Sequence, residues 1–137
     1  MTSNPPGAET PAAIAANQWR QIIDSATDTA IITTDPQGNV TSWNEGARRI
    51  LGWEPAEMIG YDLDRLFTPE DLQRNITATE RRDAASLGRG GGEEGWRLRK
   101  DGTRFWASGE MAPIRGDQAE IVGFIKILRD RTAQRAA

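Results

Sequence analysis

The sequence predicts an α+β domain, because helix-like and strand-like segments follow one another in separate groups. One amphipathic segment precedes two short strands, three short helices follow, and three longer strands come last. Two turn sequences, DPQGN at residues 35–39 and KDGT at residues 100–103, join neighbouring strands. Hairpins grouped apart from helices are typical of the α+β class.

The N-terminal part divides into a tail and a helix. Residues 1–11 are rich in Pro, Gly, Ser and Thr, and we expect them to be disordered. Residues 12–26 form an amphipathic pattern in which Trp19, Ile22 and Ile23 share one face. A single helix of this length needs a docking surface to be stable, either the domain's own sheet or a second chain. These three residues are therefore candidates for dimer contacts.

The first hairpin follows this helix. Two β-branched runs, residues 30–34 and 40–43, flank the DPQGN turn. Pro36 presets its backbone φ angle and Gly38 permits a positive φ, so both residues favour a tight turn. We expect the two runs to pair as antiparallel strands.

Three short helices are predicted between the two sets of strands. Asn44 suits the N-cap of the first helix, and Gly52 suits its C-terminal end. The second helix begins near Pro55. The third begins with Thr68 as N-cap, and we expect it to run to about Ser86.

A glycine-rich stretch and three strands complete the chain. The stretch GRGGGEEG at residues 88–95 predicts a mobile loop. Strands are expected over residues 94–100, 103–114 and 120–128. The last of these contains IVGFIKIL, which is apolar on both faces, as expected of a central strand covered on both sides.

The composition excludes several classes of chemistry. The chain has 137 residues, no cysteine and no histidine, which rules out disulfides, thiolate catalysis, cysteinyl-linked chromophores and His-ligated haem. A net charge of −3 gives no reason to expect nucleic acid as a partner. No apolar run approaches the ~20 residues of a membrane span, and no signal peptide is visible. We expect a cytoplasmic protein without a metal site.

Four stretches in this order resemble the PAS sensor domain. They are DPQGNVTSWN, RRILGWEPAEMIG, RLRKDGTRFWASGEMAPIR and GFIKILRDRT. The resemblance implies a PAS fold over residues 27–132, with a five-stranded antiparallel sheet in the order 2-1-5-4-3 and short helices on one face. It also implies that residues 133–137 begin a linker to an output domain.

The resemblance assigns roles to four polar residues. Asp130 and Thr132 match the Asp-x-Thr that closes the family's last strand, and they are expected to anchor the start of an output helix. Glu57 and Lys100 match the positions of a salt bridge common in the family. We place these four residues on the route of signal transmission.

The second hairpin is similar to that of the blue-light flavin (LOV) branch. The position of the flavin-bound cysteine falls on Asp62, the two flavin-binding Asn positions fall on Arg97 and Ala107, and the Gln position falls on Leu128. All four are replaced. A cysteinyl adduct is therefore excluded, whereas noncovalent flavin held by other residues remains open.

A small organic ligand is the other candidate for the pocket. Ala107, Gly109 and Leu128 leave room, and Arg97 can pair with a ligand carboxylate. Strand alternation instead groups Trp96 with Leu98 and sets Arg97 on the opposite face. We expect Arg97 to be solvated.

The sequence favours a sensory module over an enzyme. It has no histidine, the commonest general base, and no cysteine. Its glycine stretch precedes a strand rather than a helix, so it makes no phosphate cradle. We expect the sensor part of a histidine kinase or a similar signal-transduction protein, acting as a homodimer with a downstream output domain. The alternatives are a noncovalent flavin sensor and a ligand-free dimerisation module.

Overall fold

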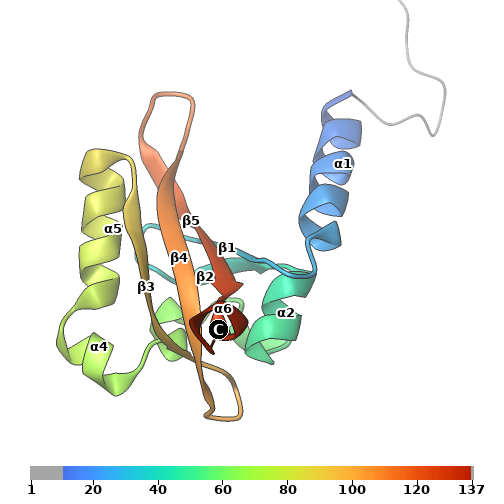
Figure 1. Ribbon diagram of the computed structural model, residues 1–137. Helices are drawn as coiled ribbons and strands as arrows, with labels where there is room; N and C mark the ends of the chain where they lie inside the picture. The colour runs from blue at the N-terminus through green and yellow to red at the C-terminus, as the bar shows by residue number, and fades with distance from the viewer. Residues whose placement is uncertain (1–10, 137) are drawn as a thin grey trace, which may run out of the picture.

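The structure is a computed structural model that describes residues 11–136 (Figure 1). The predicted disordered tail lies outside this range, except for Pro11, which is helical. The elements are α1 (Pro11–Ser25), β1 (Ala30–Thr34), β2 (Val40–Trp43), α2 (Glu45–Leu51), α3 (Pro55–Met58), the 3₁₀ helix η1 (Leu63–Leu66), α4 (Pro69–Gln73), α5 (Ile76–Leu87), β3 (Gly90–Leu98), β4 (Arg104–Arg115), β5 (Ile121–Asp130) and α6 (Thr132–Ala136).

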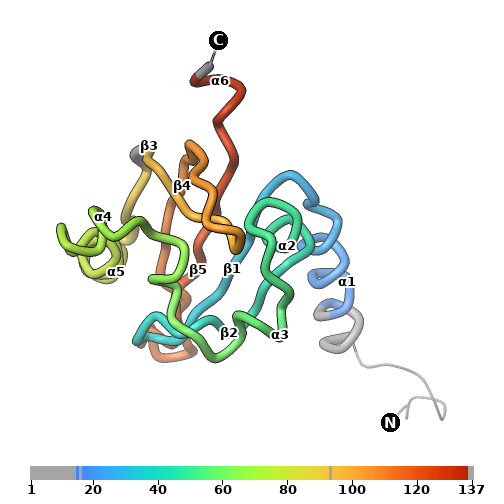
Figure 2. Tube along the Cα trace, turned by 90° about the horizontal axis from the view of Figure 1, so that it is seen from below, coloured from blue at the N-terminus to red at the C-terminus, as the bar shows by residue number. Residues whose placement is uncertain are grey.

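The five strands form one antiparallel sheet in the order β2-β1-β5-β4-β3. This is the order that the PAS resemblance implies, and the α+β fold class is confirmed. Helices α2 to α5 cover one face, which we call the inner face, with α4 and α5 beside β3 (Figures 1 and 2). Helix α6 projects from the body of the domain at the end of β5 (Figure 2).

Local signals account for the N-terminal half. The Asp35 carboxylate accepts hydrogen bonds from the backbone of Gln37 and Asn39 and closes the first hairpin turn. Asn44 caps α2 through its Oδ1, which accepts from the Ala47 backbone. Its Nδ2 donates to backbone oxygens at the end of α1 and the start of β1. One side chain therefore joins three elements.

Two expectations for the middle of the chain are wrong. The third predicted helix is two helices, because Asn75 adopts a left-handed conformation (φ 57°) between α4 and α5. The predicted mobile loop is largely the first half of β3, where Gly90 pairs with Met111. A Cβ atom on Gly90 would lie 2.1 Å from the Glu80 backbone oxygen, so glycine permits α5 to approach the strand.

Strand β5 is central, but it is not covered on both sides by the described residues. Phe124 and Leu128 are buried on the inner face, whereas Ile125 and Ile127, which alternate with them on the outer face, are only half-buried. Helix α1 does not lie across this face; it packs near α2 and leaves Trp19 65% exposed (Figure 1). The apolar outer face of β5 is therefore a surface of the described chain.

Candidate functional site

The inner face of the sheet holds a buried cluster of charged side chains. Lys126 on β5 is completely buried, and its Nζ donates a hydrogen bond to Glu80 Oε2 on α5 at 2.6 Å. Arg97 on β3 is also buried, with its Nη2 3.7 Å from Glu80 Oε1 and its Nη1 3.6 Å from Asp71 Oδ2. Two cations therefore face two carboxylates, and the formal charges of the cluster cancel.

Burial dominates the electrostatics of this cluster. Desolvation lowers the pKa of Lys126, and the Glu80 carboxylate opposes that shift. Desolvation likewise lowers the pKa of Arg97, against the attraction of Glu80 and Asp71. The Phe67 ring lies against both cations, with the Arg97 guanidinium carbon 4.3 Å from its centroid. A charge in such surroundings is tolerated only because a counter-ion contacts it.

Four of the five predicted pocket residues meet on this inner face. Ala107 and Leu128 are buried, and Gly109 pairs with Leu128 across β4 and β5. The expectation of a solvated Arg97 is wrong, because its side chain is 5% exposed and points inward. Asp62 is elsewhere: it is exposed, and its carboxylate caps η1 by accepting from the Asp64 backbone.

Lys126 occupies the room that glycine leaves on β4. A Cβ atom on Gly109 would lie 3.1 Å from both Cε and Nζ of Lys126. Lys126 and Glu80 were not among the site residues predicted from the sequence. Lys126 is a charged residue within the otherwise apolar segment IVGFIKIL. A lysine buried there needs a partner of opposite charge, and this requirement could have prompted a search for an acidic residue such as Glu80. Noncovalent flavin stays a prediction that the absorption spectrum of the purified chain would test.

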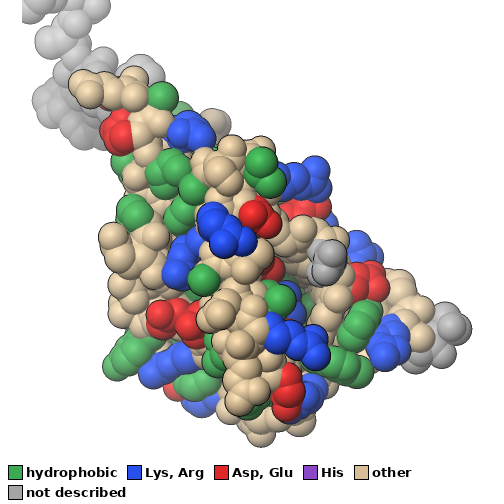
Figure 3. Space-filling model, turned by 90° about the vertical axis from the view of Figure 1, so that its left-hand side faces the viewer, with side chains coloured by type: hydrophobic (Ala, Val, Ile, Leu, Met, Phe, Trp, Pro, Cys, Tyr) green, Lys and Arg blue, Asp and Glu red, His purple; other side chains and the backbone are tan. Residues whose placement is uncertain are grey.

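A groove of about 650 Å³ opens between α4 and α5 on one side and β3 and β4 on the other. Arg97 reaches it from the interior, and its Nε is buried without a hydrogen-bond partner among the described residues. Trp96 and Trp106 line the part of the groove that passes the edge strand β3 onto the outer side of the sheet, and they form an edge-to-face pair with ring centroids 5.1 Å apart. Acidic and basic side chains are interspersed on this side of the molecule (Figure 3).

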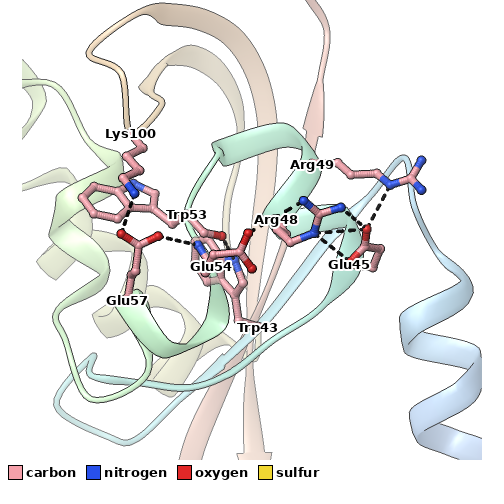
Figure 4. A network of polar contacts seen from close by, with 8 residues as sticks. All are labelled: Trp43, Glu45, Arg48, Arg49, Trp53, Glu54, Glu57 and Lys100. Atoms are coloured by element: carbon pink, nitrogen blue, oxygen red, sulfur yellow. Dashed lines mark hydrogen bonds and ion pairs between the residues drawn. The ribbon is translucent and has the colours of Figure 1, made fainter.

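A second group of ion pairs lies at the surface (Figure 4). The predicted salt bridge is present, with Lys100 Nζ 2.6 Å from Glu57 Oε2. The hydrogen bond from Lys100, together with one from the Glu54 backbone, lowers the pKa of Glu57. In the neighbouring helix α2, Glu45 pairs with Arg48 and Arg49, which lower its pKa to about 2.

The junction of β5 and α6 is held by several contacts. Asp130 Oδ2 accepts a hydrogen bond from Arg99 at 3.0 Å, and Asp130 Oδ1 accepts from the Thr132 backbone at 2.9 Å. Thr132 Oγ1 accepts from the Trp106 backbone at 3.3 Å. The Arg135 guanidinium lies 4.3 Å from the Trp106 ring centroid. These contacts hold the start of α6 against β4 and the turn that follows β3.

The predicted dimer contacts lie on α1. Trp19 and Ile22 are 65% and 59% exposed, whereas Ile23 is half-buried and its backbone oxygen accepts from Asn44. Over residues 11–136, no helix is long and apolar enough to cross a membrane. No group of three potential metal ligands comes together in that same range.

Comparison with known proteins identifies the fold and its class. The family model described as PAS domain matches residues 28–133. A PAS domain structure from Colwellia psychrerythraea superposes with a TM-score of 0.79 at 29% identity, over 87% of this chain and 98% of that chain. The chain belongs to the PAS domain family.

Two further proteins are similar to it. Two-component system protein A of Emericella nidulans is 35% identical over 119 residues, which is 87% of this chain and 17% of that protein. The chain therefore spans only a small part of this curated relative. An RNA-binding Light-Oxygen-Voltage receptor shares the fold, with a TM-score of 0.73 at 20% identity, over 98% of this chain and 38% of that one.

Proposed function

We propose that this chain is the sensory module of a two-component protein and passes a change in its core into an output domain through β5 and α6. The output domain is that of a histidine kinase or a related signalling enzyme, and the sensory module itself does no chemistry. The name of the Emericella relative supports the two-component assignment. Small shifts in packed elements are sufficient to bias two arrangements of a helical connection.

The Asp130 carboxylate is the observation that carries this proposal. Its two oxygens accept hydrogen bonds from Arg99, the residue that follows β3, and from the backbone of Thr132, the first residue of α6, so one side chain joins the end of β3 to α6. Lys126, four residues earlier on β5, holds the buried cluster. A movement of the cluster is therefore expected to reach α6 along one strand.

The test replaces Asp130 with Ala in a chimaera in which this chain substitutes for the matched segment of the Emericella protein. Phosphoryl transfer by the chimaera is the output. Asp130→Ala is expected to decouple that output from the sensory module and to speed hydrogen exchange in α6 amides. Asp117→Ala, the same change in the exposed turn before β5, is the matched control. Equal output and equal exchange in both variants would contradict the proposal.

A homodimer formed through α1 is a second part of the proposal. Exposed Trp19 and Ile22 on α1, and the half-buried Ile125 and Ile127 on the outer face of β5, are apolar surfaces that a partner subunit would cover. Deleting residues 1–25 is expected to convert a dimer into a monomer by light scattering. A dimer that survives the deletion would rule out this interface.

A further inference from the structure

The groove between α4, α5, β3 and β4 contains a buried donor that the protein leaves unused. A guanidinium has five N–H donors, and that of Arg97 makes one hydrogen bond within the described residues, to the Trp96 backbone oxygen. Asp71 and Glu80 lie 3.6 and 3.7 Å away, close enough for attraction but beyond hydrogen-bond distance. Nε has no partner at all in the described chain. An acceptor oxygen from a ligand or water would satisfy it.

The charge balance restricts what that ligand can be. Arg97 and Lys126 are already matched by Glu80 and Asp71, so an incoming anion would leave an uncompensated negative charge in a poorly solvated place. A zwitterion brings no net charge. Its carboxylate meets the free donors of Arg97, and its ammonium meets Asp71, whose side chain is 20% exposed and lines the groove.

We propose that this groove binds a small zwitterion of the α-amino acid class. The volume of about 650 Å³ lies within the roughly 300–1,000 Å³ of ligand pockets. An arginine and an aspartate side by side, each with unused hydrogen-bonding capacity, complement the two ends of an α-amino carboxylate. Ile76 provides apolar lining on the helical side of the groove, and Trp96 and Trp106 provide it where the groove passes the edge strand β3.

The groove also reaches the output helix. Arg135 of α6 lines it and lies against the rings of Trp96 and Trp106, at 5.1 and 4.3 Å from their centroids. A ligand that moves either ring changes the contact that fastens α6. The inference thus supplies the proposed sensor with a ligand class, and to that extent it rests on the proposed function.

Calorimetric titration of the full chain with the individual proteinogenic L-amino acids tests the site. At least one is expected to bind and to change tryptophan fluorescence, while its α-amide, its N-acetyl derivative and its decarboxylated amine bind about 10- to 100-fold more weakly, because each lacks one charge-assisted contact. Binding by none of the amino acids, or equal binding of the derivatives, would overturn the proposal.

Asp71→Asn distinguishes a zwitterion site from an anion site. This variant removes the partner of the ammonium and leaves the cluster with a net positive charge. Amino acid affinity is expected to fall about 10- to 100-fold, while the affinity for acetate rises. Asp117→Asn, outside the groove, keeps wild-type affinity, and thermal melting verifies that both variants are folded. Unchanged affinity in Asp71→Asn would contradict the site, and since binding is measured without any output domain, this failure is separate from a failure at Asp130.

Discussion

Two lysine–glutamate pairs in this domain have the same geometry and opposite surroundings. Lys100 and Glu57 at the surface are 2.6 Å apart, and so are Lys126 and Glu80 in the interior. The surface side chains are 48% and 33% exposed, whereas the interior ones are 1% and 7% exposed. Water solvates the charges of the first pair if the bridge breaks, but it cannot reach those of the second.

This contrast shows that distance alone says little about the consequence of an ion pair. A surface salt bridge adds little to the free energy of unfolding, because water stabilises the two separated charges nearly as well as the bridge does. A buried pair also adds little net stability compared with apolar residues, yet it makes the loss of either partner expensive. The interior cluster therefore constrains β5, β3 and α5 to one arrangement, which is the property that a signalling strand needs.

The largest expected effect comes from Glu80→Ala. It leaves Lys126 buried without its anion, which costs about 3–5 kcal/mol of unfolding free energy. The lysine can also stay buried in its neutral form. Removing its proton at pH 7 costs roughly 4–5 kcal/mol for a group whose ordinary pKa is about 10.4, so the loss of stability cannot be much larger than this. Urea unfolding followed by tryptophan fluorescence measures the change. A loss below about 1 kcal/mol would show that the pair is not buried as described.

Two additional measurements sharpen that prediction. In Glu80→Ala the charge that raises the pKa of Lys126 is gone, so its pKa falls further and the destabilisation should shrink as pH rises towards 10. The double variant Glu80→Leu with Lys126→Met replaces the pair with apolar groups and should recover most of the lost stability. Failure of both would assign the loss to packing rather than to charge.

Lys100→Ala is expected to destabilise the domain much less than Glu80→Ala does. Both members of its pair become hydrated when the bridge is lost, so the urea midpoint is expected to move far less than in Glu80→Ala. Lys100→Met retains the aliphatic chain near the Trp53 ring and separates loss of charge from loss of packing. A midpoint shift as large as that of Glu80→Ala would remove the distinction between the two pairs.

Local signals explain why much of the fold was predictable. The first hairpin has the predicted bounds, since Pro36 and Gly38 set its turn and β-branched residues flank it. The sheet order came from resemblance to a family, not from local pattern. The split between α4 and α5 was missed because Asn75 in a left-handed conformation looks like any polar helix residue.

The site was less predictable because its members are distant in sequence. Glu80 and Lys126 are 46 residues apart, and no periodicity connects them. Arg97 was expected to be solvated because Trp96, on the opposite face, was the better candidate for the interior. In the structure the Trp96 ring packs edge-to-face against the Trp106 ring on the outer side of the sheet. Only the tertiary arrangement shows that the charged neighbour is the buried one.

The smallest expected effect is a pH dependence at the surface. Arg48 and Arg49 lower the pKa of Glu45 from 4.5 to about 2. A carboxylate with a depressed folded pKa stabilises fully above its unfolded pKa, so this contribution is lost as pH falls from about 4.5 to about 2. Glu45→Gln is expected to show a shallower loss of stability over that window than the wild type.

Adding salt distinguishes the stability contributed by the surface ion pairs of Glu45 from that contributed by the buried pair of Lys126 and Glu80. Exposed pairs are screened at ionic strengths near 1 M, where the Debye length is about 3 Å, whereas buried pairs are screened much less. The acid-limb difference between wild type and Glu45→Gln should therefore vanish in high salt, while the destabilisation by Glu80→Ala persists. Thermal unfolding at a series of pH values, with and without salt, measures both. An acid limb in Glu45→Gln identical to that of the wild type at low salt would mean that the pairs around Glu45 are too loose to shift its titration.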